Sequence, residues 1–305
     1  MLSYALRRLL GAIPTLLILL TLAFVMMRAA PGGPFDADRE LPAQVKANLE
    51  AKYHLDEPLY QQYGRYLWDI AHFDFGPSFQ YRDITVNDLI ASGFPVSLKL
   101  GGASLAFALL FGVPLGMVAA LRQNRPADYA AMTTAMLGIS IPNFVLAPLM
   151  ILLFAVYNDW LPAGGLGGWQ NYVMPVLALG TAMMAYVARL SRASTIEVMR
   201  SNYVRTARAK GLSARRVVWV HALPAALTPV VSFLGPAAAG IITGSVVIET
   251  IFGIPGLGQF FVQGALNRDY TLVMGVVLFY GMLIVAFNLV VDLLYGWLDP
   301  RVSYS

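Results

Sequence analysis

The chain has 305 residues, of which 58% are hydrophobic and only 12% are charged. Soluble domains carry about 25% charged residues, so this composition excludes an ordinary water-soluble globule and indicates an integral membrane protein. The absence of cysteine excludes a disulfide framework, a thiolate metal site and a cysteine nucleophile. The three histidines, His54, His72 and His221, are scattered, which argues against a histidine-rich metal site.

Six apolar stretches have roughly the length, about 20 residues, that a helix needs to cross a bilayer. They are residues 9–27, 94–121, 131–157, 172–188, 230–248 and 272–297. The first follows Arg7 and Arg8, as a signal peptide would. Its apolar run is longer than that of a signal peptide and no small-x-small cleavage site follows, so we expect an uncleaved anchor. The predicted fold is an all-α membrane protein with six transmembrane helices.

The distribution of Lys and Arg predicts the orientation, because cytoplasmic loops are enriched in these residues. The 158–171 loop has no basic residue and the 250–271 loop has only Arg268, whereas basic residues precede the first stretch and occur at 122–130. The most basic loop, 189–228, contains Arg189, Arg192, Arg200, Arg205, Arg208, Lys210, Arg215 and Arg216. We therefore predict that this loop and both termini lie in the cytoplasm.

The segment 30–93 differs from the rest of the chain, because its acidic residues outnumber its basic ones and it is rich in Tyr. Its apolar residues recur at helical spacing between 45 and 70. The expected organisation is an N-terminal anchor helix at 1–29, a small external helical subdomain at 30–93, and a five-helix transmembrane core at 94–305.

Charged residues at membrane depth are costly and are functional candidates by default. Four occur in or beside the apolar stretches: Arg28, Lys99, Glu249 and Asp292. Arg28, Lys99 and Asp292 lie where a side chain can reach an interface. Glu249 directly precedes a glycine-rich run, and we predict that it is a gate or a helix-positioning residue.

The sequence lacks the patterns of a membrane enzyme. No histidine lies within an apolar stretch, HExxH is absent, and no lysine follows a glycine, which excludes a Walker A phosphate loop. We therefore expect a transport subunit without its own ATPase site and with no catalytic, cofactor-binding or metal-binding residues. No internal repeat of the kind common in secondary transporters is evident. A membrane scaffold or enzyme with no transport role is the alternative from another class.

The order of residues in the 189–228 loop predicts two helices joined by a corner. Ser194 and Glu197 have the spacing of a capping box, which would start a helix at 195–210 with Gly211 as its C-terminal cap. Ser213 would cap a second helix that Pro224 would end. Contact with anionic lipid would explain the positive charge of the loop, but it would not explain the order helix, glycine, helix.

The residues of the 189–228 loop resemble the cytoplasmic signature of ABC importer permeases. In that signature, a Glu-Ala-Ala triplet precedes Gly and then Leu-Pro at fixed spacing. The triplet positions are Arg205, Thr206 and Ala207, and the later positions are Gly211 and Leu223-Pro224. Arg205, Thr206 and His221 depart from the general signature. The run RTARAKGL at 205–212 is similar to the variant found in the peptide and nickel permeases of this family.

The resemblance extends over nearly the whole chain, including VIETIFGIPGLGQFFVQGALNRDY and the ending DLLYGWLDPRV. These two runs and the opening LRRLLGAIPTLLILLTLAFVMMRAAPGGP resemble the B-type subunit of the family, and the external segment looks most like the oligopeptide branch. The resemblance implies a type I ABC importer permease fold in the bacterial cytoplasmic (inner) membrane. It also implies import of oligopeptides by alternating access; dipeptides, nickel or another small solute are the alternatives within the family.

The implied partners are a second, homologous permease, two cytoplasmic ATPases that bind ATP and Mg²⁺, and an external peptide-binding protein. The implied ATPase coupling residues are Arg205, Thr206, Ala207, Arg208, Lys210, Gly211, Leu223 and Pro224. The candidate gate, or contact with the binding protein, comprises Glu249, Gly253, Pro255, Gly256 and Gly258.

Overall fold

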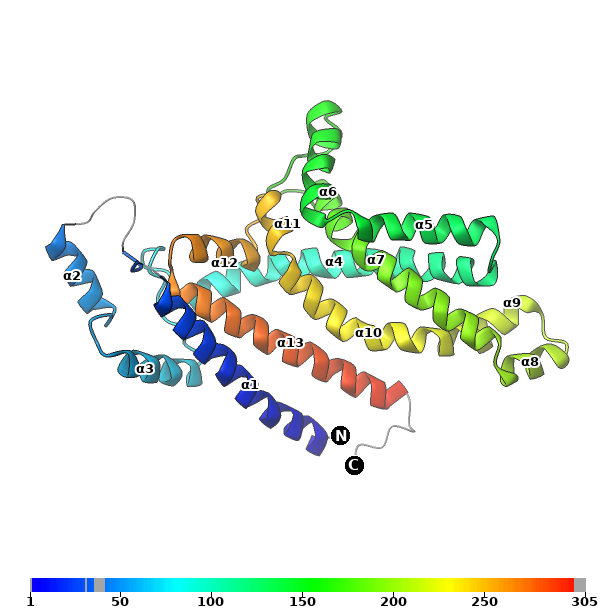
Figure 1. Ribbon diagram of the computed structural model, residues 1–305, viewed down its shortest axis with the longest axis horizontal. Helices are drawn as coiled ribbons and strands as arrows, with labels where there is room; N and C mark the ends of the chain where they lie inside the picture. The colour runs from blue at the N-terminus through cyan, green and yellow to red at the C-terminus, as the bar shows by residue number, and fades with distance from the viewer. Residues whose placement is uncertain (1, 31, 36–41, 299–305) are drawn as a thin grey trace.

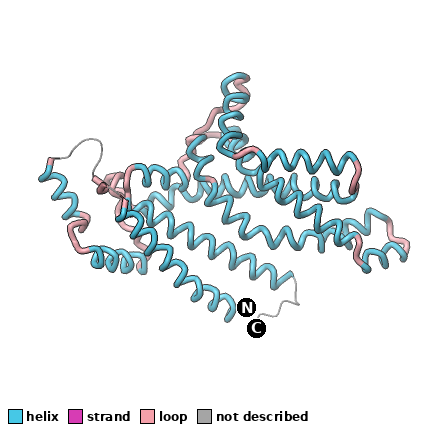
Figure 2. Tube along the Cα trace, in the orientation of Figure 1, coloured by secondary structure: helices cyan, strands magenta, loops and turns pink. Residues whose placement is uncertain are grey.

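The computed structural model describes residues 2–30, 32–35 and 42–298, and these residues form helices joined by loops (Figures 1 and 2). Within these ranges there is no strand beyond one antiparallel bridge between Pro77 and Thr85. The predicted all-α class is therefore confirmed.

Five long helices form the bundle: α1 (Leu2–Ala29), α4 (Val86–Leu121), α7 (Gln170–Met199), α10 (Leu223–Gly244) and α13 (Tyr270–Leu298). The shorter α-helices are α2 (Ala43–Lys52), α3 (Leu59–Ala71), α5 (Pro126–Ser140), α6 (Asn143–Met150), α8 (Asn202–Ala209), α9 (Ala214–Arg216), α11 (Val246–Ile251) and α12 (Leu257–Leu266). Two π-helical stretches, Ile151–Tyr157 and Val217–Ala222, continue α6 and α9.

In the described part of the chain, five helices are long and apolar enough to cross a membrane, and a bent pair makes six if it counts as one span. The bent pair is the predicted stretch 131–157, which turns through 96° between Ser140 and Asn143. The cause is Pro142, which disfavours helical geometry in the preceding residue. Ile141 accordingly has an extended backbone, with φ −95° and ψ 116°. In Figure 1, α6 projects away from the bundle.

The centre of the bundle is the close packing of α4 against α7. A Cβ atom built on Gly116 would lie 2.2 Å from the carbonyl oxygen of Ala188 and 2.7 Å from the Cβ of Ser191. Only glycine permits this approach of the two backbones, as is common where membrane helices pack.

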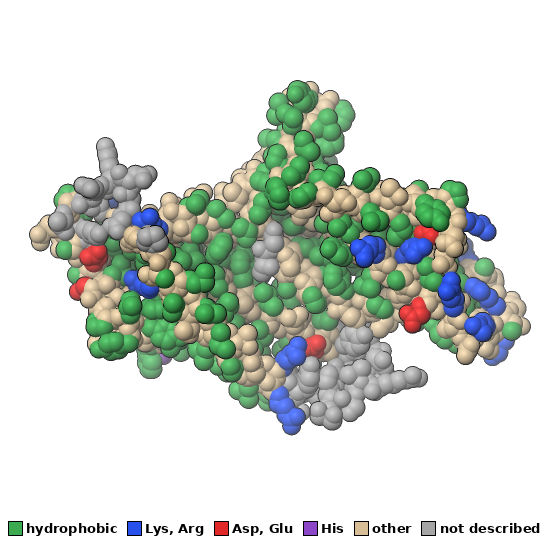
Figure 3. Space-filling view, viewed as in Figure 1, with side chains coloured by type: hydrophobic (Ala, Val, Ile, Leu, Met, Phe, Trp, Pro, Cys, Tyr) green, Lys and Arg blue, Asp and Glu red, His purple; other side chains and the backbone are tan. Residues whose placement is uncertain are grey.

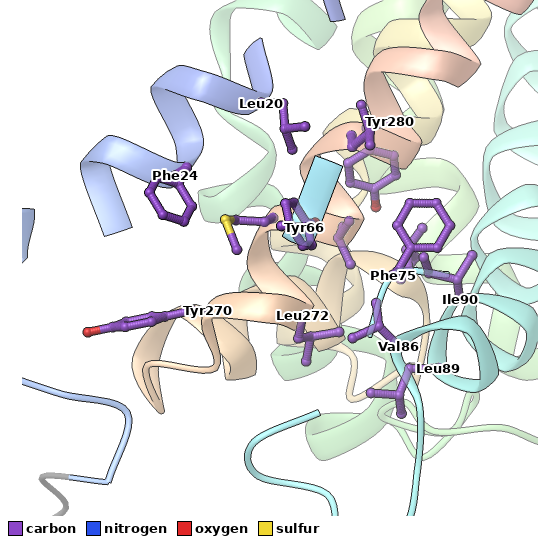
Figure 4. Close-up of a cluster of buried hydrophobic side chains, with 14 residues drawn as sticks. Leu20, Phe24, Tyr66, Phe75, Val86, Leu89, Ile90, Tyr270, Leu272 and Tyr280 are labelled. Carbon is purple, nitrogen blue, oxygen red and sulfur yellow. The ribbon is translucent and has the colours of Figure 1, made fainter. Parts of the chain in front are cut away.

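A second core lies where the Ala29 end of α1 meets α3, α4 and α13 (Figure 4). It includes Phe24 of α1, Tyr66 of α3, Val86 of α4 and Leu272 of α13, all of them buried. Helix α4 begins at Val86, within the segment 30–93, and Thr85 caps it in a reciprocal capping box with Asp88. The segment 30–93 therefore packs directly against the membrane helices.

Candidate functional site

The first eleven residues of the 189–228 loop belong to α7, which runs without a break to Met199. The predicted capping box at Ser194 and Glu197 is therefore wrong, because both residues lie inside this helix. Ser194 and Thr195 are buried. The packing of α7 overrides the local capping signal. Ser191, one turn before Ser194, is buried against Gly116 of α4.

A bidentate ion pair fastens this part of α7 to the start of α5. The Nε and Nη2 atoms of Arg192 each donate a hydrogen bond of 2.7 Å to the carboxylate of Asp128. Asp128 is only 2% exposed, and it also accepts a hydrogen bond of 2.9 Å from the backbone N–H of Asn124. Sequence reasoning missed Asp128, because its partner lies in a distant helix.

Helix α8 is the short helix that the loop forms next, and its N-cap is Ser201. Its inner face is Val204 and Ala207, which pack with Val217 and Ala222. The other predicted coupling residues of the helix and its C-cap are exposed: Arg205, Thr206, Arg208 and Lys210. The structure therefore gathers the basic side chains on the outer face of α8 and turns Ala207 inward.

Gly211 forms the predicted corner, with φ +76°, a conformation that favours glycine. The backbone N–H of Gly211 donates to the carbonyl of Arg208 at 2.9 Å, and that of Leu212 donates to the carbonyl of Ala207 at 3.3 Å. This pair of bonds is a Schellman motif with Gly211 directly after the C-cap Lys210, so the prediction that Gly211 ends the helix is confirmed. The predicted cap at Ser213 is also confirmed, since its side chain accepts from the N–H of Arg216.

Pro224 does not end the second helix, contrary to the prediction. The chain continues from α9 through the π-helical stretch Val217–Ala222 directly into α10, which has Pro224 in its first turn. Pro224 lies at the junction where the π-helical stretch passes into α10. Leu223 is half-buried and Pro224 is exposed. The corner at Gly211 is therefore joined to a membrane helix by continuous helical backbone.

The predicted gate residues form one tight turn between α11 and α12. Gly253 has φ +59°, which a residue with a side chain rarely adopts. The chain then reverses through Pro255, and α12 begins after Gly256. Glu249 of α11 faces this turn and is 0% exposed.

The carboxylate of Glu249 caps the N-terminus of α12. Its Oε2 atom accepts hydrogen bonds from the backbone N–H groups of Gly258, at 2.8 Å, and Gln259, at 3.2 Å. Its Oε1 atom accepts from the hydroxyl of Ser245 at 2.6 Å. The remaining N–H of this first turn, that of Leu257, donates to Ser97 of α4 at 2.8 Å. A negative charge at a helix N-terminus is favourable, so Glu249 fixes α12 to α11.

The glycines of the turn leave room for this carboxylate. A Cβ atom on Gly256 would lie 2.4 Å from Oε2 of Glu249 and 2.7 Å from the hydroxyl oxygen of Ser97. A Cβ atom on Gly258 would lie 2.6 Å from the Cα of Val246. The structure thus brings the predicted gate residues together around one buried charge.

The other three charges at membrane depth have different surroundings. Arg28 donates to the side-chain oxygen of Gln62, and its guanidinium lies over the ring of Tyr270 at 5.0 Å from the centroid. Asp292 lies 3.0 Å from the guanidinium of Arg8. Lys99 is exposed on the surface of α4.

A third buried carboxylate, Asp269, was not anticipated. It precedes α13 and accepts a hydrogen bond from the N–H of Leu272 at 3.1 Å, which caps that helix. Its other oxygen accepts from the hydroxyl of Ser78 and, at 3.1 Å, from the N–H of Phe79. Asp269 therefore ties the segment 30–93 to α13. An Asp directly before a long apolar run is a capping signal in the sequence, but its contacts with residues 78 and 79 are not.

No group of three or more metal-ligating side chains (His, Cys, Asp or Glu) occurs within the described ranges. A basic helix continues through a fixed corner into one membrane helix, and a buried carboxylate holds a reversing turn at the far end of that helix.

A bundle of helices that are long and apolar enough to cross a membrane is the architecture of a multi-pass membrane protein. The chain belongs to the family of binding-protein-dependent transport system inner membrane components, whose profile matches residues 112–304. It is thus an ABC importer permease of the inner membrane. As predicted, it is a transport subunit and not an enzyme. Such permeases work with ATPase and substrate-binding components.

Relatives in several bacteria match the chain over its full length. The oligopeptide transport system permease protein OppB of Haemophilus influenzae is 54% identical over 100% of both chains. OppB of Escherichia coli (strain K12) is 55% identical with the same coverage. The dipeptide transport system permease protein DppB of Bacillus subtilis is 47% identical over 99% of this chain and 98% of its own length.

Two solved structures resemble the fold. The inward-facing MetNI methionine ABC transporter matches with a TM-score of 0.56 and 19% identity, over 69% of this chain and 96% of that one. An amino acid ABC transporter with histidines gives a TM-score of 0.57 and 19% identity, over 69% of this chain and 94% of that one. These similarities confirm the predicted type I importer permease fold.

Proposed function

We propose that this chain is the B-type permease of an oligopeptide importer and carries peptides into the cytoplasm by alternating access. The observation that carries the proposal is the identity of 54% and 55%, over full length, to relatives named as oligopeptide permeases. The dipeptide permease of Bacillus subtilis, at 47%, supports import of dipeptides as the second candidate.

The orientation of the chain in the membrane follows from the distribution of its Lys and Arg residues. Lys and Arg side chains gather at the end of the bundle that carries α8 and α9 and near the start of α1 (Figure 3). Cytoplasmic loops are enriched in these residues, so this end faces the cytoplasm and both termini lie there. The opposite end, with the turn at Glu249 and the segment 30–93, faces the external binding protein.

The coupling site is the exposed face of α8. Arg205, Arg208 and Lys210 are solvent-exposed in this chain, and the Schellman corner at Gly211 fixes their direction. A groove on an ATPase subunit docks this face, and closure of the ATPases moves the loop. Because helical backbone continues from α9 into α10, the movement passes to the membrane helix that leads to Glu249. ATP and Mg²⁺ bind to the ATPases, and this chain binds no cofactor.

The second permease covers the arm formed by α6 and the π-helical stretch that follows it. This arm leaves α5 at 96° and carries large exposed apolar side chains on several sides, including Phe144, Leu149, Val156 and Tyr157. An apolar helix that leaves the bundle at this angle needs a partner of similar polarity. A homologous permease with the same fold provides it, and the two chains enclose the pathway.

The turn from Glu249 to Gly258 acts as the outer gate. This assignment is supported by the carboxylate of Glu249, which holds α12 against α11. Because of this contact, a change in the angle of α10 and α11 would move α12 as well.

Uptake in a strain that lacks only this gene tests the function and separates the substrates. Cells receive a labelled oligopeptide, a labelled dipeptide or labelled nickel, with and without the gene restored on a plasmid. The proposal expects oligopeptide uptake to disappear on deletion and to return on complementation. Loss of dipeptide or nickel uptake alone would assign the alternative substrate. Unchanged uptake of all three would contradict an importer of these solutes.

A further inference from the structure

We propose that α3 is a membrane-interface helix, whose exposed aromatic side chains insert into the lipid leaflet at the Ala29 end of α1. The proposal concerns helix Leu59–Ala71 and the Phe73 that follows it. It does not depend on the transported solute or on which side of the membrane faces outward.

The depth of α3 follows from its contacts with α1. The hydroxyl of Tyr63 is 2.6 Å from the hydroxyl of Thr21, and the Tyr63 ring lies 5.2 Å from that of Phe24. The apolar span of α1 is Leu6–Ala29. With a rise of about 1.5 Å per residue, Thr21 lies about 12 Å from the Ala29 end, inside the span. A helix that reaches this level beside α1 is at the bilayer interface and not above it. Figure 1 shows α3 beside this end of α1.

The side chains of α3 divide into an apolar and a polar arc. Successive residues of a helix are about 100° apart, which places Gln61, Arg65 and Asp69 together on one side. Arg65 pairs with Glu57 at 2.6 Å, and Arg65 and Asp69 line a cavity of about 300 Å³. The rest of the circumference is apolar, apart from the buried Gln62 and the glycine at 64. Such a helix has the pattern of one that lies in a membrane surface.

Only half of the apolar arc packs against protein in this chain. Tyr66 is 7% exposed and lies in the core shown in Figure 4. The other half carries Tyr60, which is 74% exposed, and Trp68, which is 69% exposed. Phe73, just after the helix, is 76% exposed. Tyr and Trp are the residues enriched at the level of lipid headgroups.

The exposed half continues the lipid-facing surface of α1. Leu22, Val25 and Met26 at the same end of α1 are each more than half exposed. Figure 3 shows hydrophobic side chains running together along the lower left margin of the molecule, where α1 and α3 lie. This continuity identifies lipid, the medium that already surrounds α1, as the occupant of the aromatic face.

Spin labels on α3 test the proposal in the assembled transporter, reconstituted in vesicles of phosphatidylethanolamine and phosphatidylglycerol. The chain has no cysteine, so each introduced cysteine is its only one; the partner subunits are used as cysteine-free variants. A nitroxide is placed at Tyr60→Cys, Trp68→Cys and, as the exposed position on the polar arc, Arg65→Cys. Collision with oxygen, which dissolves in lipid, is compared with collision with a water-soluble nickel chelate.

The proposal expects a ratio of oxygen to nickel collision that is several-fold higher at 60 and 68 than at 65. Dominant nickel collision at all three positions would overturn it, because the helix would then lie in water. Low collision with both reagents at 60 and 68 would also overturn it, because a protein partner would then cover the face. A second measurement needs no label. Phospholipid brominated near the headgroup should quench the tryptophan fluorescence of the wild type more than that of Trp68→Phe, and equal quenching would contradict the proposal.

Discussion

The Oε2 atom of Glu249 accepts a hydrogen bond of 2.8 Å from the backbone N–H of Gly258, across the turn that reverses the chain between α11 and α12. The bond joins a charge with no exposure to solvent to the positive end of a helix dipole. Together with the bond from the N–H of Leu257 to Ser97 of α4, it positions the first turn of α12.

Replacement of Glu249 by alanine should destabilise the assembled transporter and reduce uptake. The change leaves the buried N–H of Gly258 and the part-buried N–H of Gln259 without an acceptor, at about 1–3 kcal/mol for a fully buried group. Glu249→Gln keeps an acceptor oxygen and should cost less. Thermal unfolding of the purified complex measures the effect. Thr250→Ala, an exposed neighbour, is the control, and an equal Tm for the alanine variants at 249 and 250 would contradict the capping role.

Gly256→Ala should disturb the same turn without removing any hydrogen-bonding group. Its Cβ would lie 2.4 Å from Oε2 of Glu249 and 2.7 Å from Oγ of Ser97, and both atoms are held by hydrogen bonds. Overpacking of this kind costs about 1–3 kcal/mol. Gly64→Ala, a helical position with no atom within 4 Å of the new Cβ, should be neutral or slightly stabilising. Similar Tm values for the two variants would show that the turn tolerates a side chain.

The ion pair between Asp128 and Arg192 should give a measurable coupling energy. Asp128 is 2% exposed and the Arg192 side chain 27% exposed, so solvent screens the pair less than an ordinary surface pair. A double-mutant cycle with Asp128→Ala, Arg192→Ala and the double variant should give a coupling of about 0.5–3 kcal/mol in unfolding free energy. Additive losses in the single variants would mean that the contact contributes nothing.

Gly211→Val should weaken binding of the ATPase subunits. A β-branched residue at φ +76° is strained, at about 1–2 kcal/mol, and relaxing the strain would redirect α8. The measurement is the amount of ATPase that co-purifies with the permease. Gly165→Val is the matched control, because Gly165 has φ +81° with open space around it but lies outside the 189–228 loop. Equal co-purification with both variants would exclude a role of the corner in docking.

Local signals in the sequence were sufficient for the corner at Gly211 and the cap at Ser213, because both are formed by residues a few positions apart. The predictions that a helix begins at Ser194 and that one ends at Pro224 were wrong, because contacts and backbone geometry outside these local signals decide the structure there. Packing against Gly116 of α4 keeps α7 helical beyond Ser194. A π-helical stretch before Pro224 allows the chain to continue as helix.

The buried carboxylates were also hard to interpret from the sequence, because their hydrogen-bond partners are not local. Glu249 could be singled out as a charge beside a glycine-rich run, but its function as a cap depends on a reversal of the chain that brings Gly258 back to it. Asp128 and Asp269 attracted no prediction, because their partners Arg192 and Ser78 are far away in the sequence. The bend at Pro142 was missed because the apolar composition on both sides of it is uniform.

ATP-driven peptide uptake by the Arg205→Glu/Arg208→Glu variant tests most directly whether the α8 face couples the ATPases to the membrane. Arg122→Glu/Arg125→Glu, which reverses two exposed charges in the α4–α5 loop at the same end of the bundle, is the control for net charge. In proteoliposomes we expect uptake to fall by about tenfold or more in the α8 variant, corresponding to about 1.4 kcal/mol or more of docking free energy. The control should retain its uptake. Undiminished uptake by the α8 variant in a fully assembled complex would contradict the account.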